Sequence, residues 1–90
     1  MRSHTTERFR KALEALPAQV QRQAKKAFEK WERDPYHPSL RFKNIHSDKT
    51  IYSVRISLDY RALGVREKGQ MIWFWIGSHV DYEKLISHLQ

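Results

Sequence analysis

The hydrophobic period of this chain changes partway along its length, and this change limits the fold more than any other feature. Up to residue 33 the apolar side chains recur every three or four positions, which is typical of amphipathic helices. After Pro35 and Pro38 apolar and polar residues alternate, which is typical of half-buried strands. The sequence therefore predicts helices followed by a sheet, the α+β class of fold.

Two helices are expected before these prolines. The first spans residues 6–16, with Thr5 or Thr6 as its N-cap, and the second begins at Pro17 and ends before Asp34. Pro17 cannot continue the first helix, but it suits the first turn of the second. Because so few residues separate the helices, they should form an antiparallel hairpin.

Four strands are expected after the prolines, at residues 40–43, 52–57, 60–66 and 70–77. Short connections between the later strands predict a twisted, mainly antiparallel sheet. The last strand is apolar on both faces, so it should lie centrally, with the helical hairpin packed over one face. Ser78 can cap a short C-terminal helix, whereas residues 2–5 are too few to assign.

The composition excludes several classes of protein. Ninety residues predict a single domain covering 1–90. The chain has no cysteine, and its five histidines form no ligand pair on one element, so neither a disulfide nor a metal site is expected. The longest apolar run, Met71 to Ile76, is far below the roughly 20 residues of a membrane span. No N-terminal segment resembles a signal peptide, so the expected location is the cytoplasm.

The charge of the chain is strongly positive and unevenly distributed. Seventeen Lys and Arg against ten Asp and Glu give a net charge of +7, and residues 1–45 carry eleven of the basic but only five of the acidic side chains. Such an excess favours a polyanion or an acidic protein as the partner. The alternative is a solvated helix face that only keeps the protein in solution.

The candidate site is a set of cationic and proton-transferring side chains, because GxSxG, HExxH and Gly-rich phosphate-loop motifs are all absent. We expect the sheet to bring these residues together: Lys43, Arg55, Arg61, His79 and Tyr82. Histidine side chains have a reference pKa near 6.5, so His79 is the best candidate for proton transfer. Lys43 is the second candidate for this role.

Each of three candidates also has a purely structural interpretation. Arg61 falls in an otherwise apolar strand, so it must reach solvent, a ligand phosphate or a carboxylate such as Asp59 or Asp81. His79 lies where a helix N-terminus attracts anions, but it could equally be a capping residue. Tyr82 could be the first apolar member of the C-terminal helix stripe.

Three segments of the second half resemble the RelE/ParE superfamily of bacterial toxins. They are IYSVRI at 51–56, DYRAL at 59–63 and WFWIGSHVDY at 73–82. The first half is similar to the helix–proline–helix opening of the same superfamily, so the resemblance covers nearly the whole chain and favours the RelE-like branch. It implies a helical hairpin followed by a twisted antiparallel sheet.

The resemblance also implies a function and a set of residue roles. It implies a type II toxin that an antitoxin holds inactive and that cleaves mRNA on the ribosome without metal or cofactor. By position, Arg61 matches the phosphate-stabilising arginine and Arg55 a second basic residue, while His79 stands where an Arg or His often follows the last strand. Tyr82 matches a tyrosine that orients or stacks on the nucleotide. The chain departs from the pattern at Ser53, where a further basic residue can stand, and it offers no obvious carboxylate base.

Two other functions fit the same fold. One is a ParE-like inhibitor of DNA gyrase, and the other is an RNA-binding regulatory domain without catalytic activity. The implied partners are an acidic, partly disordered antitoxin, mRNA and the ribosome, and operator DNA reached through the antitoxin complex. No membrane partner is expected.

Overall fold

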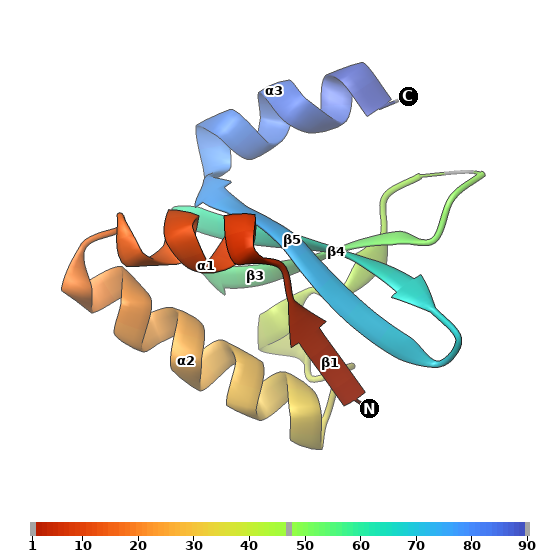
Figure 1. Cartoon of the computed structure of the whole chain (residues 1–90), viewed down its shortest axis with the longest axis horizontal. Helices are drawn as coiled ribbons and strands as arrows, with labels where there is room; N and C mark the ends of the chain where they lie inside the picture. The colour runs from red at the N-terminus through yellow and green to blue at the C-terminus, as the bar shows by residue number, and fades with distance from the viewer. Residues whose placement is uncertain (1, 47, 90) are drawn as a thin grey trace.

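The computed structural model describes residues 2–46 and 48–89, and within them it has the expected α+β architecture (Figure 1). The strands are β1 (Arg2–Thr5), β2 (Lys43–Asn44), β3 (Ile51–Ser57), β4 (Tyr60–Glu67) and β5 (Gln70–Ser78). The helices are α1 (Glu7–Glu14), α2 (Ala18–Arg33), the 3₁₀ helix η1 (Pro38–Leu40) and α3 (His79–Leu89). None of the helices described is long and apolar enough to cross a membrane.

The helical hairpin forms where the sequence predicts it. Thr6 caps α1, since its Oγ1 accepts a hydrogen bond of 3.0 Å from the backbone N–H of Phe9. Pro17 separates the helices and precedes the first turn of α2. The side chain of Gln21 then joins the two helices by donating to the carbonyl of Leu16 at 2.9 Å. Figure 1 shows α1 and α2 on one side of the sheet and α3 on the other.

The sheet contains the predicted antiparallel strands and one additional strand. The strand order is β1-β5-β4-β3-β2, and β1 pairs parallel to β5, with Ser3 opposite Met71. The backbone N–H of Thr6 extends this pairing by donating to the carbonyl of Trp73 at 3.0 Å. β5 therefore has a neighbour on both edges, as its apolar sequence predicts, while β4 occupies the middle position.

The strand expected at residues 40–43 is shorter than the alternation predicts. Leu40 belongs to η1, and Arg41 takes a left-handed conformation with φ of 46°, so only Lys43 and Asn44 pair with β3. Leu40 and Phe42 are nevertheless both buried. The alternation therefore predicts correctly which side chains are buried. It is wrong about the backbone, which forms a 3₁₀ turn here and not a strand.

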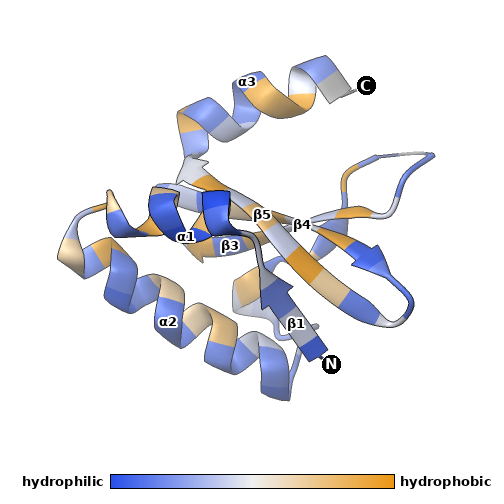
Figure 2. Cartoon of the chain, in the orientation of Figure 1, coloured by the Kyte–Doolittle hydropathy of each residue, from blue (hydrophilic) through white to orange (hydrophobic). Residues whose placement is uncertain are grey.

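Apolar side chains cover both faces of the sheet. On one face Trp31 of α2 packs edge-on against Trp73 of β5, with ring centroids 5.3 Å apart. On the other face Leu63 packs in a smaller cluster with Tyr82 of α3. The β4–β5 register shifts after Leu63, so Phe74 is an extra residue, and it joins the α3 side. Figure 2 shows apolar colouring in the central part of β5, whereas β1 is mostly hydrophilic and α2 carries both colours, as expected of an amphipathic helix.

Candidate functional site

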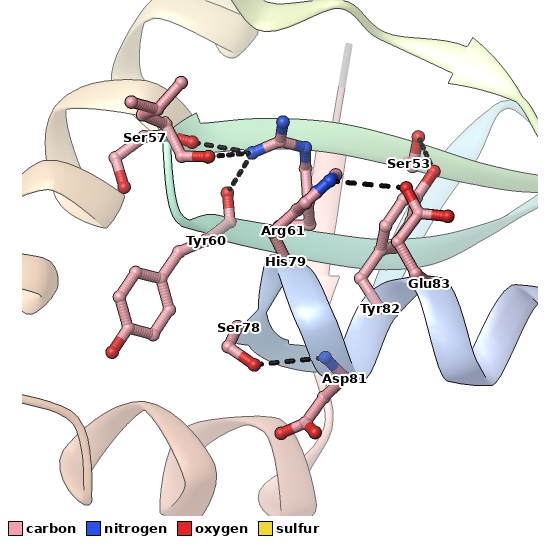
Figure 3. Close-up of polar contacts among 10 residues, drawn as sticks. Ser53, Ser57, Tyr60, Arg61, Ser78, His79, Asp81, Tyr82 and Glu83 are labelled. Carbon is pink, nitrogen blue, oxygen red and sulfur yellow. Dashed lines mark hydrogen bonds and ion pairs between the residues drawn. The ribbon is translucent and has the colours of Figure 1, made fainter.

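A hollow of about 370 Å³ opens between α3 and the sheet, and we call it the α3 hollow. Four of the five predicted site residues line it: Lys43, Arg61, His79 and Tyr82. Arg41, Ser53 and Glu83 lie in the same wall. The structure therefore brings together most of the site that the sequence predicts, although its members come from different elements of the chain. Figure 3 shows Arg61 of β4 with His79 and Tyr82 of α3.

The β3–β4 turn and the end of β5 fix the geometry of this hollow. Arg61 of β4 lies opposite Gly77, close to the end of β5, and α3 begins two residues later at His79. The backbone N–H of His79 donates to the carbonyl of Asp59 at 2.7 Å. This bond ties the first residue of α3 to the turn that precedes Arg61, so the two side chains face the same hollow.

Arg61 is held by carbonyl groups and makes no ion pair with Asp59 or Asp81 in the described part of the chain. Its Nη1 donates to the carbonyls of Ser57 at 2.6 Å and Tyr60 at 2.9 Å, with a longer contact to Leu58 at 3.3 Å. All its hydrogen bonds to described residues come from Nη1, so Nε and Nη2 remain for a ligand. Burial, followed by the charge of Arg55, lowers the pKa of Arg61, yet a guanidinium stays charged at neutral pH.

His79 has a carboxylate partner that sequence reasoning missed. Its Nε2 lies 3.3 Å from Oε1 of Glu83, one helical turn further along α3. Its Nδ1 is buried and has no hydrogen-bond partner among the described residues. Because the sequence already predicts a helix capped by Ser78, the spacing of four residues was the available signal for this pair.

Tyr82 is a packed residue, which agrees with its interpretation as part of the apolar stripe. It is 5% exposed, and its hydroxyl donates to Oγ of Ser53 at 3.3 Å. Its ring stacks on that of His79, with centroids 6.0 Å apart and an interplanar angle of 27°. The chain departs from the toxin pattern at Ser53. This residue is 2% exposed, and its hydrogen bond with Tyr82 gives it a structural role.

Arg55 is the one predicted residue that does not line the α3 hollow. It pairs with Arg61 across β3 and β4, but it lines a different hollow, against α2. Arg41, which follows η1, was missed because the strand predicted there does not form. The α3 hollow thus contains three basic side chains, Arg41, Lys43 and Arg61, and among its described lining residues Glu83 is the one carboxylate. This balance favours an anionic ligand.

Metal-binding side chains do not cluster in residues 2–46 and 48–89. No three His, Asp or Glu side chains of these ranges lie close enough to hold one ion. The chemistry available in the α3 hollow is cationic stabilisation of an anion, together with proton exchange at an imidazole.

A small basic α+β domain with this sheet order and this cationic hollow falls in the class of RelE/ParE toxins. The comparison with family models agrees, because residues 18–84 match the ParE-like toxin domain. The match spans most of the chain, and the chain therefore belongs to this family of toxins. Among curated proteins, no sequence matches it.

Solved structures with the same fold include several RelE-like toxins. A chain of the RelB–RelE antitoxin–toxin complex from Methanococcus jannaschii is 16% identical, with a TM-score of 0.71 over 90% of this chain and 95% of that one. YafQ from Escherichia coli BL21(DE3) is 12% identical, with a TM-score of 0.69 over 91% and 98%. The isolated Escherichia coli RelE toxin is 19% identical, with a TM-score of 0.63 over 98% of both chains. The predicted RelE-like fold is confirmed.

Proposed function

We propose that this protein is the toxin of a type II toxin–antitoxin system and an endoribonuclease that cleaves mRNA on the ribosome. The observation that carries the proposal is the α3 hollow, which combines three basic side chains with the imidazole of His79. Cleavage of RNA through its own 2′-hydroxyl needs these two kinds of group, cations for the phosphorane and a proton-transferring side chain.

In the proposed reaction the 2′-oxygen attacks the adjacent phosphorus while the bond from phosphorus to the 5′-oxygen breaks. The products are a 2′,3′-cyclic phosphate and a free 5′-hydroxyl. One proton leaves the 2′-hydroxyl and one reaches the 5′-oxygen, so the protons balance. No cofactor takes part in this scheme.

The residues of the α3 hollow divide these tasks. Arg61 stabilises the phosphorane through Nε and Nη2, because Nη1 is engaged with the β3–β4 turn. His79 carries out one proton transfer through Nε2, and Glu83 stabilises the protonated ring from 3.3 Å. Lys43, on a different element, is the second group able to exchange a proton. Tyr82 acts as a positioning residue, because its ring supports His79 from a buried position.

Induction in bacteria tests this proposal, with two variants and two matched controls. Arg61→Ala and His79→Ala should each relieve growth arrest and restore translation, while the proteins remain folded. Arg66→Ala removes an arginine from the same strand outside the α3 hollow, and His88→Ala removes an exposed histidine from α3, so both should leave arrest unchanged. Arrest that persists undiminished in both site variants would refute the assigned site.

The proposal includes an acidic, partly disordered antitoxin as partner. RelE proteins from Methanococcus jannaschii and Pyrococcus horikoshii were solved in complex with RelB. A net charge of +7 on the present chain makes an acidic segment that folds on binding a suitable inhibitor. Such a complex would reach operator DNA through the antitoxin, and both components would act in the cytoplasm. Coexpression with the neighbouring reading frame, followed by copurification, tests this pairing.

Inhibition of DNA gyrase is the second candidate, because the matching family model is described as ParE-like. Under that function the first effect of induction would be a DNA-damage response, with translation unaffected at early times. A protein silent in both assays, with RNA binding that weakens steeply as salt rises, would instead be a regulatory RNA-binding domain.

A further inference from the structure

A second hollow, of about 380 Å³, lies between α2, η1 and β3, and we call it the α2 hollow. Its polar lining consists of cations and uncharged hydrogen-bonding groups, chiefly Gln23, Lys26, Lys30, Ser39 and Arg55. No acidic side chain is among the described residues that line it. The α2 hollow thus has the charge of an anion-binding site, and the reaction proposed for the α3 hollow does not use it.

The polar groups of the α2 hollow are held in place by the local structure. Residues 23, 26 and 30 follow one another at helical spacing on α2, so their side chains lie on one face. Nζ of Lys30 donates to Oγ of Ser39 at 3.1 Å, and this oxygen lies 2.8 Å from Nδ1 of His37. These contacts connect α2 to η1, and they place an ammonium and a hydroxyl at the rim of the hollow.

Arg55 connects the two hollows. It lines the α2 hollow, and it is the register partner of Arg61, which lines the α3 hollow. Like charges at directly opposed positions of a sheet are destabilising, and the charge of Arg55 adds to burial, the larger cause, in lowering the pKa of Arg61. Neither arginine makes an ion pair with a described carboxylate. An anion bound along this pair would remove the repulsion that the folded chain otherwise retains.

Ser57 gives a second connection between the hollows. Its carbonyl accepts the 2.6 Å hydrogen bond from Nη1 of Arg61, and the same residue lines the α2 hollow. The basic side chains of the two hollows, which lie on opposite sides of the sheet, can therefore be connected in one row around the β3–β4 turn, from Lys43 and Arg61 past Arg55 to Lys26 and Lys30. A row of this kind suits a polymer that carries one negative charge at each repeat.

We propose that the α2 hollow binds a backbone phosphate of the RNA strand, on a nucleotide that flanks the cleaved bond. The inference rests on the proposed function, since it places the reacting phosphate in the α3 hollow and leads the strand past Arg55. Because these contacts are to phosphate, they position the RNA strand but give no specificity for its base sequence. Leu40 and Ile56 also border this hollow, but both are buried, at 2% and 8% exposed, so the polar groups form its binding surface.

Binding of single-stranded RNA to the full chain tests this inference. The probes are two fluorescent oligonucleotides with methylated 2′-hydroxyls, which block the attack: a dinucleotide and a strand of about ten nucleotides. The test variant is Lys26→Gln combined with Lys30→Gln. Lys25→Gln is the matched control, because Lys25 is an exposed lysine of the same helix that does not line the α2 hollow.

For the longer strand, the double variant should weaken binding about tenfold at low salt. The slope of log affinity against log salt should also fall by about 0.7 for each phosphate that the variant no longer neutralises. Binding of the dinucleotide should not change, and Lys25→Gln should bind both probes like the unaltered chain. Arg55→Gln should behave like the double variant and provides a second test from another element.

Three results would overturn the inference. The double variant could bind the longer strand like Lys25→Gln, or it could weaken both probes equally, which would indicate only a general effect of charge. It could also bind RNA normally while losing copurification with a coexpressed acidic antitoxin, in which case the α2 hollow is an antitoxin site. None of these measurements requires cleavage, so they are independent of whether Arg61→Ala and His79→Ala relieve growth arrest.

Discussion

The buried hydrogen bond between Tyr82 and Ser53 allows a quantitative test of the role of Tyr82. Both residues are nearly inaccessible, at 5% and 2% exposed, and the hydroxyl oxygens are 3.3 Å apart. Typical O–H···O bonds measure about 2.7–2.8 Å, so this bond falls at the weak end of the range. We therefore expect its net contribution to the free energy of unfolding to be about 0.5–1 kcal/mol.

Three variants separate this contribution from the cost of an unpaired group. Ser53→Ala leaves the Tyr82 hydroxyl buried without a partner and should cost about 1–2 kcal/mol. Tyr82→Phe leaves Oγ of Ser53 unpaired, but a serine hydroxyl can turn to a local backbone group, so we expect about 1 kcal/mol. The double variant leaves no unpaired group and should cost less than the sum of the two, with a coupling of about 1 kcal/mol.

Urea unfolding measures these differences through the midpoint concentration. With a slope of about 1–3 kcal/mol per molar urea, each single variant should lower the midpoint by roughly 0.5 M. Single variants that unfold like the original chain, or a double variant whose cost equals the sum, would refute the buried pair. RNA cleavage gives the second readout. Tyr82→Phe should retain activity if Tyr82 only supports His79, and it should lose activity if the hydroxyl contacts the nucleotide.

Three further predictions concern single residues of the sheet and of the α3 hollow. Gly64→Ala should destabilise the fold by about 1–3 kcal/mol, seen as a lower Tm, because a Cβ at this position would lie 2.7 Å from the ring of Trp73. Arg61→Lys should abolish cleavage, because an ammonium cannot hold the turn carbonyls and present a planar pair of donors at once; full activity in this variant would contradict the assigned geometry. Glu83→Gln should change stability by less than about 1 kcal/mol, since its pair with His79 is solvent-exposed, while slowing cleavage at neutral pH in a single-turnover assay; an unchanged rate would remove Glu83 from the site.

Local patterns were sufficient to predict most of the fold. The caps, prolines and apolar stripes of α1 and α2 depend on residues within a few positions of one another, and the structure has both helices. β1 could not be predicted in this way, because four residues carry no period and their pairing partner is β5, at the other end of the chain. Arg41 was missed for a different reason, since it takes a left-handed conformation after η1, where the alternating pattern predicts a strand.

The candidate site shows a comparable limit. The toxin resemblance, together with the residue types, gave Lys43, Arg61, His79 and Tyr82, and these residues lie in one hollow. It did not distinguish the buried Tyr82 from the more exposed members of the site, because Tyr82 packs against residues far away in sequence, such as Leu63 of β4, and bonds to Ser53 of β3. It also placed Arg55 with the others, whereas this residue lines the α2 hollow, although it remains the register partner of Arg61.

Arg61 couples the stability of the fold to the chemistry proposed for it. One nitrogen of its guanidinium holds the carbonyls of the β3–β4 turn, and this turn also accepts the backbone N–H that begins α3 at His79. The cation that would stabilise the phosphorane and the imidazole that would move the proton are thus fixed by the same few hydrogen bonds. Pre-organised groups of this kind need no rearrangement during the reaction, which makes them effective in stabilising a transition state. A site built from flexible surface lysines would lack this property, and for that reason the end of β5, rather than the basic surface of α2, is where we place the chemistry.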